Sequence, residues 1–282
     1  MFIKSGTFLG SCEDFKTTKV ALIGVPMDFT VSFRPGARSG PGRIREVSEV
    51  LEEYSPLRNR ELSEVPFSDL GDLDLPWGNV EKSLGIIEKA ANFCLKERKK
   101  PFFLGGEHLI TWPIVKSIYK EYKDLKVIQF DAHADLREDY LGEKFSHATV
   151  MRQICNVIGP ENVYQLGIRS GTKEEFAYGN EYTNFYPHKL LEVIEEVAES
   201  CAGYPVYLTI DIDVFDPAYA PGTGTPEPGG HTSREVIGAL SCLKDLTLVG
   251  CDIVEVAPAH DTGDITSILA AKMVREILLT FF

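Results

Sequence analysis

The sequence of 282 residues lacks the cysteine patterns of metal ribbons and disulfide scaffolds. Such structures group their cysteines at short spacings, often as Cys-x-x-Cys pairs, and no such pair occurs here. The six cysteines are instead scattered over the chain: Cys12, Cys94, Cys155, Cys201, Cys242 and Cys251. We therefore expect reduced thiols and a cytoplasmic protein.

Long apolar runs and the glycine motifs of nucleotide-binding loops are also missing. The chain has no stretch of about 18 apolar residues and no apolar leader after Met1. Neither Gly-x-Gly-x-x-Gly nor Gly-x₄-Gly-Lys-Ser/Thr is present. These absences give no support for a membrane span or for a nucleotide cofactor.

Basic residues are few compared with acidic ones. There are 29 Lys and Arg against 42 Asp and Glu, which gives a formal net charge of −13. An acidic surface does not attract nucleic acid or anionic membranes. We therefore expect neither as a partner, and a small cationic substrate suits the charge better.

The residues that are present indicate an α/β protein. Hydrophobic residues make up 44% and charged residues 25% of the chain, as in ordinary globular proteins. Short apolar runs predict strands at residues 19–25, 66–70, 101–104, 126–130, 162–168, 205–210 and 246–254. Periodic segments predict helices at residues 42–54, 80–99, 112–122, 148–157, 190–200, 233–244 and 264–281. This alternation predicts a mainly parallel sheet between two helix layers, in one three-layer αβα domain over residues 1–282.

Three of the predicted strands end in acidic or histidine residues. Ligands of open parallel sheets bind at the carboxyl ends of the strands. Clustered carboxylates repel one another unless cations neutralise them. The sequence therefore predicts a metal site from His108, Asp131, His133, Asp135, Asp211 and Asp213.

Counting these ligands favours two ions over one. Four carboxylates and two imidazoles exceed what a single divalent ion normally takes from a protein. Side chains two apart in an extended segment share a face, so Asp211 and Asp213 can converge on one place. Oxygen-rich donors with some imidazole favour Mn²⁺, and the absence of cysteine argues against a thiolate zinc site. Two such cations can activate a water as a nucleophile.

The motifs at these positions resemble those of the ureohydrolase (arginase and agmatinase) family, and the agmatinases most. The likeness runs in order over nearly all of the chain and includes Gly105–His108, Asp131–Asp135, Asp211–Pro217 and Glu255–Pro258. The resemblance implies an arginase-like fold and a dinuclear manganese hydrolase. It also implies that agmatine is cleaved to urea and putrescine, as in polyamine biosynthesis, by a homo-oligomer that is a trimer or hexamer.

The resemblance also implies how the ligands divide between the ions. One ion is expected on His108, Asp131, Asp135 and Asp211, and the other on Asp131, His133, Asp211 and Asp213. Asp131 and Asp211 would then bridge the two ions. Glu107 stands where the family more often has Asp, and Ala134 stands where Thr or Ser is common, but neither is a ligand position.

Two further residues are expected to act on the substrate. His147 aligns with the family's catalytic histidine, and an imidazole can carry a proton to a departing amine. Asp135 is an alternative donor of that proton. Glu255 is expected to bind the substrate guanidinium, since a carboxylate matches that planar group. The alternative interpretation gives neither residue a role in catalysis. In that case His147 only begins a helix, and Glu255 pairs with a buried arginine such as Arg169 or Arg152.

Several alternatives stay open at this level. Guanidinobutyrate is a candidate substrate if Arg137 or Arg34 faces the pocket. Arginine is disfavoured because the arginase-type Asn is missing from Leu136–Asp139. Formiminoglutamate is a further candidate substrate. The same metals would then serve to cleave a formimino group, and the product would be formamide rather than urea. A non-catalytic metal-binding assembly protein is the alternative outside the enzymes.

Overall fold

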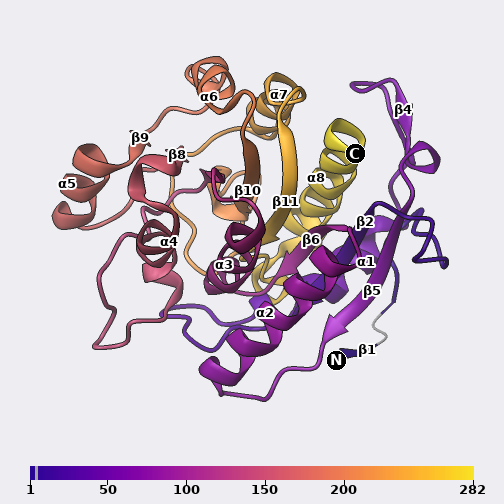
Figure 1. The fold of residues 1–282 in the computed structure, drawn as a ribbon, viewed down its shortest axis with the longest axis horizontal. Helices are drawn as coiled ribbons and strands as arrows, with labels where there is room; N and C mark the ends of the chain where they lie inside the picture. The colour runs from indigo at the N-terminus through magenta and orange to yellow at the C-terminus, as the bar shows by residue number, and fades with distance from the viewer. Residues whose placement is uncertain (4–5) are drawn as a thin grey trace.

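The predicted apolar runs form a nine-stranded sheet in the computed structural model, which describes residues 1–3 and 6–282. Every neighbouring pair is parallel except the first, so βαβ crossovers dominate (Figure 1). In spatial order the strands are β1 (Phe2–Ile3), β5 (Phe67–Leu73), β2 (Val20–Val25), β6 (Lys100–Gly105), β11 (Thr247–Val254), β10 (Pro205–Asp211), β7 (Lys126–Phe130), β8 (Val163–Leu166) and β9 (Asn184–Tyr186).

Helices cover both faces of this sheet, as predicted. One face packs against α2 (Val80–Lys96), α3 (Thr111–Glu121) and α4 (Val150–Ile158). The other packs against α1 (Gly40–Ser48), α6 (Ile194–Cys201), α7 (Ser233–Cys242) and α8 (Ile265–Phe281) (Figure 1). The prediction of a single three-layer αβα domain with a mainly parallel sheet is therefore confirmed.

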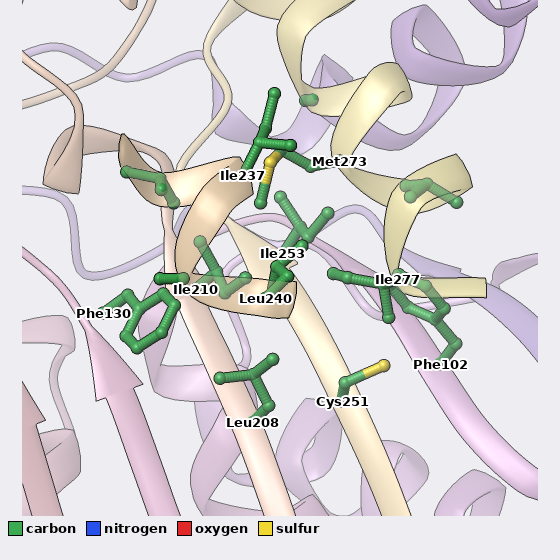
Figure 2. Packing of buried hydrophobic residues seen from close by; sticks show 14 of the residues in the cluster. Phe102, Phe130, Leu208, Ile210, Ile237, Leu240, Cys251, Ile253, Met273 and Ile277 are labelled. Atoms are coloured by element: carbon green, nitrogen blue, oxygen red, sulfur yellow. The ribbon is translucent and has the colours of Figure 1, made fainter. Parts of the chain in front are cut away.

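The central strands divide their side chains between the two faces. Leu208 of β10 and Ile253 of β11 belong to the cluster that includes Leu240 of α7 and Ile277 of α8, and Figure 2 shows these four among its labelled residues. Tyr207, one position from Leu208, belongs to the cluster on the opposite face. This alternation is the period of two that an extended strand imposes. Burying each such aliphatic side chain stabilises the fold by roughly 1.5–3 kcal/mol.

The predicted ends of two helices were wrong. The first helix was expected to run to Tyr54 but ends at Ser48, whose hydroxyl donates to the Arg45 carbonyl oxygen. Tyr54 lies instead in a short hairpin of β3 (Tyr54–Ser55) and β4 (Arg60–Glu61). A tertiary contact stabilises that hairpin, because the buried Ser55 hydroxyl donates to Glu276 of α8. The helix expected from residue 190 begins at Ile194.

Two elements near the β8 edge were not predicted. Helix α5 (Lys173–Tyr182) is largely exposed and lacks a continuous apolar stripe, so its sequence shows little helical periodicity. It begins with a capping box in which the Thr172 hydroxyl accepts from the Glu175 N–H and Glu175 accepts from the Thr172 N–H. The Thr-x-x-Glu pattern of this capping box is the sequence feature that could have predicted where α5 begins. Strand β9 adds only three residues to the sheet edge.

Over the residues that the structure describes, no helix has the length and apolar character needed to cross a membrane. Four strands meet at the centre of the sheet in the order β6, β11, β10 and β7. All four run in the same direction, so their carboxyl ends lie along one edge. The residues that follow these ends form the candidate site.

Candidate metal centre and active site

The first ligand group forms around His108, which follows β6. Its Nδ1 lies 3.1 Å from Asp131 Oδ2, 3.2 Å from Asp135 Oδ2 and 3.5 Å from Asp211 Oδ2. His108, Asp131 and Asp135 can direct one ligand atom each to a common point. Burial opposes charge on the His108 ring, but the neighbouring Asp131 and Asp135 carboxylates raise its pKa well above the ordinary value.

The second ligand group forms around His133 and shares one residue with the first. His133 Nδ1 lies 2.9 Å from Asp213 Oδ2 and 3.8 Å from Asp131 Oδ1. Asp131 thus belongs to both groups and turns a different oxygen toward each imidazole. Asp131 therefore lies between the two imidazoles, where a bridging carboxylate would have to lie. Asp211 is adjacent to the first group through its Oδ2 atom and accepts the Asp213 N–H at Oδ1, 2.9 Å away.

The pKa values of these residues show that the cluster carries more negative than positive charge. Burial, together with Asp213 and Asp135, raises the pKa of Asp131 to about 7. Against the effect of burial, Asp213 and Asp131 raise the pKa of His133 to about 10. Burial and the same neighbouring carboxylates raise the pKa of Asp211 well above its usual range. The cluster therefore favours bound protons or other cations in place of free carboxylates.

Two buried polar atoms without hydrogen-bond partners indicate that divalent cations fit this cluster of ligand groups. His108 Nδ1 and Asp213 Oδ2 are buried and have no hydrogen-bond partner among the described residues. Both atoms belong to the ligand groups. Buried polar atoms without partners are costly, and a cation would satisfy both. The donors are carboxylate oxygens and imidazole nitrogens, which suit manganese-like ions and exclude a thiolate site.

Two site residues adopt left-handed backbone conformations. Asp135 has φ 52° and Glu255 has φ 65°, values that non-glycine residues rarely adopt. The Asp135 carbonyl oxygen is held by the N–H groups of Met151 and Arg152, at 3.1 and 3.2 Å. The Glu255 N–H donates to the Gly106 carbonyl oxygen, 2.8 Å away. Backbone strain of this kind accumulates at functional sites, where it aims a side chain.

Glu255 follows β11 and lies directly against the first ligand group. Its Oε1 accepts the His108 backbone N–H at 2.7 Å. Burial and the neighbouring Glu107 carboxylate raise its pKa to about 8. Arg169 does not pair with it, since it donates to backbone carbonyl oxygens such as that of Asp213, and Arg152 stacks on Tyr178 instead. Since neither of these arginines pairs with Glu255, its carboxylate can bind another cation.

His147 begins a short helical turn and is surrounded by hydroxyl groups. Its Nδ1 lies 3.2 Å from Ser146 Oγ and 3.4 Å from Thr30 Oγ1, and its Nε2 lies 3.3 Å from Ser32 Oγ. The Thr30 hydroxyl also accepts the His147 backbone N–H at 3.0 Å. Burial lowers the pKa of His147, so the imidazole is mostly neutral at pH 7. A neutral imidazole can accept a proton at one nitrogen and release it again.

One cavity of about 290 Å³ brings the predicted residues together. It is lined by six of them, namely His108, His133, Asp135, His147, Asp211 and Glu255. Asp131 and Asp213 do not line it, but both are buried members of the ligand groups. Arg137, Tyr140 and Glu175 line the same cavity. The space is large enough for a small elongated substrate.

Residues 18–280 of this chain match the family model described as the arginase family. The chain belongs to the arginase family. It is 53% identical to an agmatinase of Bacillus cereus over 96% of this chain and 95% of that protein. It is 49% identical to an agmatinase of Bacillus subtilis over 97% of this chain and 96% of that protein. As a family member it is a hydrolase of guanidino C–N bonds.

Solved structures show the same arginase fold. A putative agmatinase from Clostridium difficile superposes with a TM-score of 0.91 at 39% sequence identity. The superposition covers 95% of this chain and 99% of that chain. The predicted resemblance to the arginase and agmatinase family is therefore confirmed.

The sequence did not predict the residues that support the ligands of this arginase-family protein. Gln129 Nε2 donates to Asp131 Oδ2 at 2.6 Å, and Gln129 Oε1 accepts from Gln165 Nε2 at 2.7 Å. Glu107 accepts from both the N–H and the hydroxyl of Thr30, which contacts His147. Both glutamines are buried polar residues within mostly apolar strands. That departure from the apolar pattern is the sequence feature that could have predicted their role.

Proposed function

We propose that residues 1–282 form one ureohydrolase domain that hydrolyses agmatine to urea and putrescine with two Mn²⁺ ions. The observation that carries the proposal is a pair of ligand groups that share Asp131 and border one cavity, which Glu255 and His147 also line. The relatives about half identical to this chain are named agmatinases, which supports the same substrate.

The proposed ligands are those of the two groups together with Asp211. His108, Asp131, Asp135 and Asp211 would hold one ion, and His133 and Asp213 would complete the second with both bridging carboxylates. When bound, a pair of divalent cations supplies Lewis acidity and a water that is activated as a nucleophile at neutral pH. The donor set supports Mn²⁺ because oxygen ligands outnumber imidazoles and no thiolate takes part.

Glu255 is proposed to bind the guanidinium group of the substrate. One of its oxygens is held by the His108 N–H, which fixes the direction of the carboxylate. Its raised pKa reflects burial without a cationic partner, so a guanidinium restores its ionised form. A planar guanidinium donates to a carboxylate through parallel N–H groups, which holds the central carbon in one place.

His147 is proposed to carry the proton that the departing amine needs. Its lowered pKa keeps the ring neutral and ready to accept a proton from the nucleophile. The hydroxyl groups of Ser32, Ser146 and Thr30 lie around the ring and hold its orientation. Asp135, which lines the same cavity, is the second candidate for this proton transfer.

Guanidinobutyrate is the second candidate substrate, and Arg137 is the observation that favours it. Arg137 lines the cavity, where a guanidinium would attract the carboxylate of a guanidino acid. However, its Nε lies 3.4 Å from Glu175 Oε2, so its charge is partly neutralised. The net negative charge of the chain and the pairing of Arg137 with Glu175 therefore favour cationic agmatine over zwitterionic guanidinobutyrate.

Urea release tests the proposal. Purified protein is incubated with agmatine, arginine, guanidinobutyrate or formiminoglutamate, each with and without added Mn²⁺. We expect urea from agmatine in the presence of Mn²⁺ and little urea from arginine or guanidinobutyrate. Hydrolysis of formiminoglutamate would release formamide in place of urea, so formamide is measured for that compound, and we expect little of it. Glu255→Gln serves as the matched control, because it keeps the shape of the side chain but loses the charge that binds guanidinium. No turnover of any compound by the Mn²⁺-loaded protein would favour a non-catalytic metal-binding protein.

The proposal extends to assembly and location. We expect a cytoplasmic homo-oligomer, a trimer or hexamer, as the family resemblance implies. Light scattering of the purified chain distinguishes these states, because they differ by whole multiples of the subunit mass. A mass of one subunit would contradict this part of the proposal.

A further inference from the structure

A buried carboxylate lies within the sheet next to the first ligand group. Asp252 lies in β11, whose residues 248–254 are all buried and include no other polar side chain. No lysine or arginine among the described residues forms an ion pair with it. Burying a carboxylate in a sheet is costly unless hydrogen bonds compensate fully. The position of Asp252 therefore requires an explanation beyond packing.

Three hydroxyl groups donate to this carboxylate. Tyr207 OH and Thr111 Oγ1 lie 2.6 and 2.8 Å from Asp252 Oδ2. Thr209 Oγ1 lies 2.6 Å from Asp252 Oδ1. Burial raises the pKa of Asp252, and the three hydrogen bonds oppose that rise. An ionised carboxylate only accepts, so each hydroxyl uses its single proton here.

Thr209 connects the carboxylate to a metal ligand. Its Oγ1 also lies 3.0 Å from His108 Nε2. Because its proton is directed at Asp252, the hydroxyl can only accept from the imidazole. His108 Nε2 must then carry a hydrogen atom. In a neutral imidazole this leaves the lone pair on Nδ1, the buried atom that faces Asp131 and Asp135 without a hydrogen-bond partner.

Rigid elements hold these groups in place. Thr209 and Asp252 are direct register partners in the parallel pair of β10 and β11. Tyr207 lies two residues before Thr209 and therefore points to the same face. Thr111 begins α3 and follows His108 by three residues. The arrangement thus depends on the sheet and on one helix, with no loop between the carboxylate and the ligand.

We propose that Asp252, acting through Thr209, is a positioning residue that holds His108 in the tautomer whose Nδ1 is free to bind a divalent cation. The inference rests on the proposed role of His108 as a metal ligand. Hydrogen-bonded partners behind a histidine ligand fix its tautomer and raise its basicity, and their loss weakens metal binding about 10–100-fold.

Calorimetric titration of the metal-free full-length protein with Mn²⁺ tests this inference. We expect Thr209→Val to bind the ion at the His108 site about 10–100-fold more weakly, since valine cannot accept from Nε2. Asp252→Asn should weaken binding similarly, because its amide can donate to Thr209 and reverse the direction of both hydrogen bonds. Thr209→Ser should restore near wild-type affinity. Tyr207→Phe is the matched control, because it contacts the same carboxylate but not His108.

A spectroscopic measurement separates positioning from a general effect on stability. In wild-type protein loaded with diamagnetic Zn²⁺ and labelled at histidine with ¹⁵N, we expect a protected downfield proton signal from His108 Nε2–H. The signal should persist in Tyr207→Phe and shift or vanish in Thr209→Val. Its absence from the wild-type spectrum would overturn the inference even if a variant failed to fold.

The two proposals fail in different ways. Wild-type protein that binds no Mn²⁺ would overturn the proposed metal centre. Wild-type protein that binds Mn²⁺ with the same affinity as folded Thr209→Val and Asp252→Asn would overturn only the positioning role. Equal losses in Thr209→Val and Thr209→Ser would also contradict it, because serine keeps the hydroxyl.

Discussion

Asp131 connects the two ligand groups through its two carboxylate oxygens. Oδ2 lies 3.1 Å from His108 Nδ1 and Oδ1 lies 3.8 Å from His133 Nδ1. Gln129 holds the Oδ2 side by a hydrogen bond of 2.6 Å, and the His133 N–H holds the Oδ1 side at the same distance. A single side chain therefore controls the spacing of both groups.

The Asp131→Asn variant should lose both metal ions together. The amide has one oxygen, so it cannot serve both groups, and we expect agmatine hydrolysis to fall by at least about 100-fold. Metal analysis of the gel-filtered protein measures the content per subunit. Asp124→Asn, at an exposed position, is the matched control and should keep its metal. Retention of one full equivalent by Asp131→Asn would show that the carboxylate does not bridge.

His147 lies outside both ligand groups although it lines the same cavity. His147→Ala should therefore keep its metal content and lower kcat by about 10²–10⁴-fold, the usual loss when a proton-transfer group is removed. Steady-state kinetics and metal analysis of the same preparation measure both quantities. His188→Asn, on an exposed turn where asparagine tolerates the positive φ, is the control. Full activity or lost metal in His147→Ala would contradict this division of roles.

At the scale of elements, the turn after β6 depends on close backbone contacts. Gly106 lies where an added Cβ would be 2.0 Å from the Met27 carbonyl oxygen and 2.6 Å from that of Val25. Both neighbours are backbone atoms, so neither can move without displacing the chain. This contact brings the loop after β2 against the segment that carries Glu107 and His108.

Gly106→Ala should therefore destabilise the protein by about 4 kcal/mol or more, or prevent folding, because the strain has no flexible side chain to absorb it. Urea unfolding measures the change. Gly85→Ala in α2 is the matched control, since nothing lies within 4 Å of its added Cβ. We expect that substitution to stabilise the protein by about 0.4–1 kcal/mol. Equal stability of the two variants would contradict the close approach.

At the scale of the whole molecule, metal binding and folding are coupled through the charges of the cluster. Without metal, the pKa values of Asp131 and His133 are about 7 and 10, compared with about 3.9 and 6.5 in an unfolded chain. At these two residues the native state therefore binds more protons than the unfolded state between about pH 4 and pH 10. The contribution of these groups to stability is complete below that range and is lost as the pH rises through it.

Mn²⁺ should therefore raise the melting temperature more at pH 8 than at pH 6. Cations replace the protons that the cluster holds, and protons compete with metal more strongly at the lower pH. At a free Mn²⁺ concentration of 100 times Kd the stabilisation is about 2.7 kcal/mol. Thermal unfolding with and without Mn²⁺ measures the shift, and Asp131→Asn should show almost none. A larger shift at pH 6 would contradict the coupling.

The sequence determined the central strands and the residues at their ends. Apolar runs that end in Asp, His or Glu are local patterns, and the direction of parallel strands brings their carboxyl ends to one edge whatever the loops do. For this reason His108, Asp135 and Glu255 could be located from sequence, and the structure places them in one cavity.

Only the tertiary structure decided the groups that hold these residues. Thr30 and Ser32 approach His147 across more than 110 positions, and Thr209 meets Asp252 across two strands. Hairpin β3–β4 forms because Ser55 reaches Glu276, which no local pattern reveals. Backbone periodicity is a property of short segments, whereas hydrogen-bond partners depend on how distant segments pack. The sequence alone therefore predicts the ligands, and the fold determines their orientation.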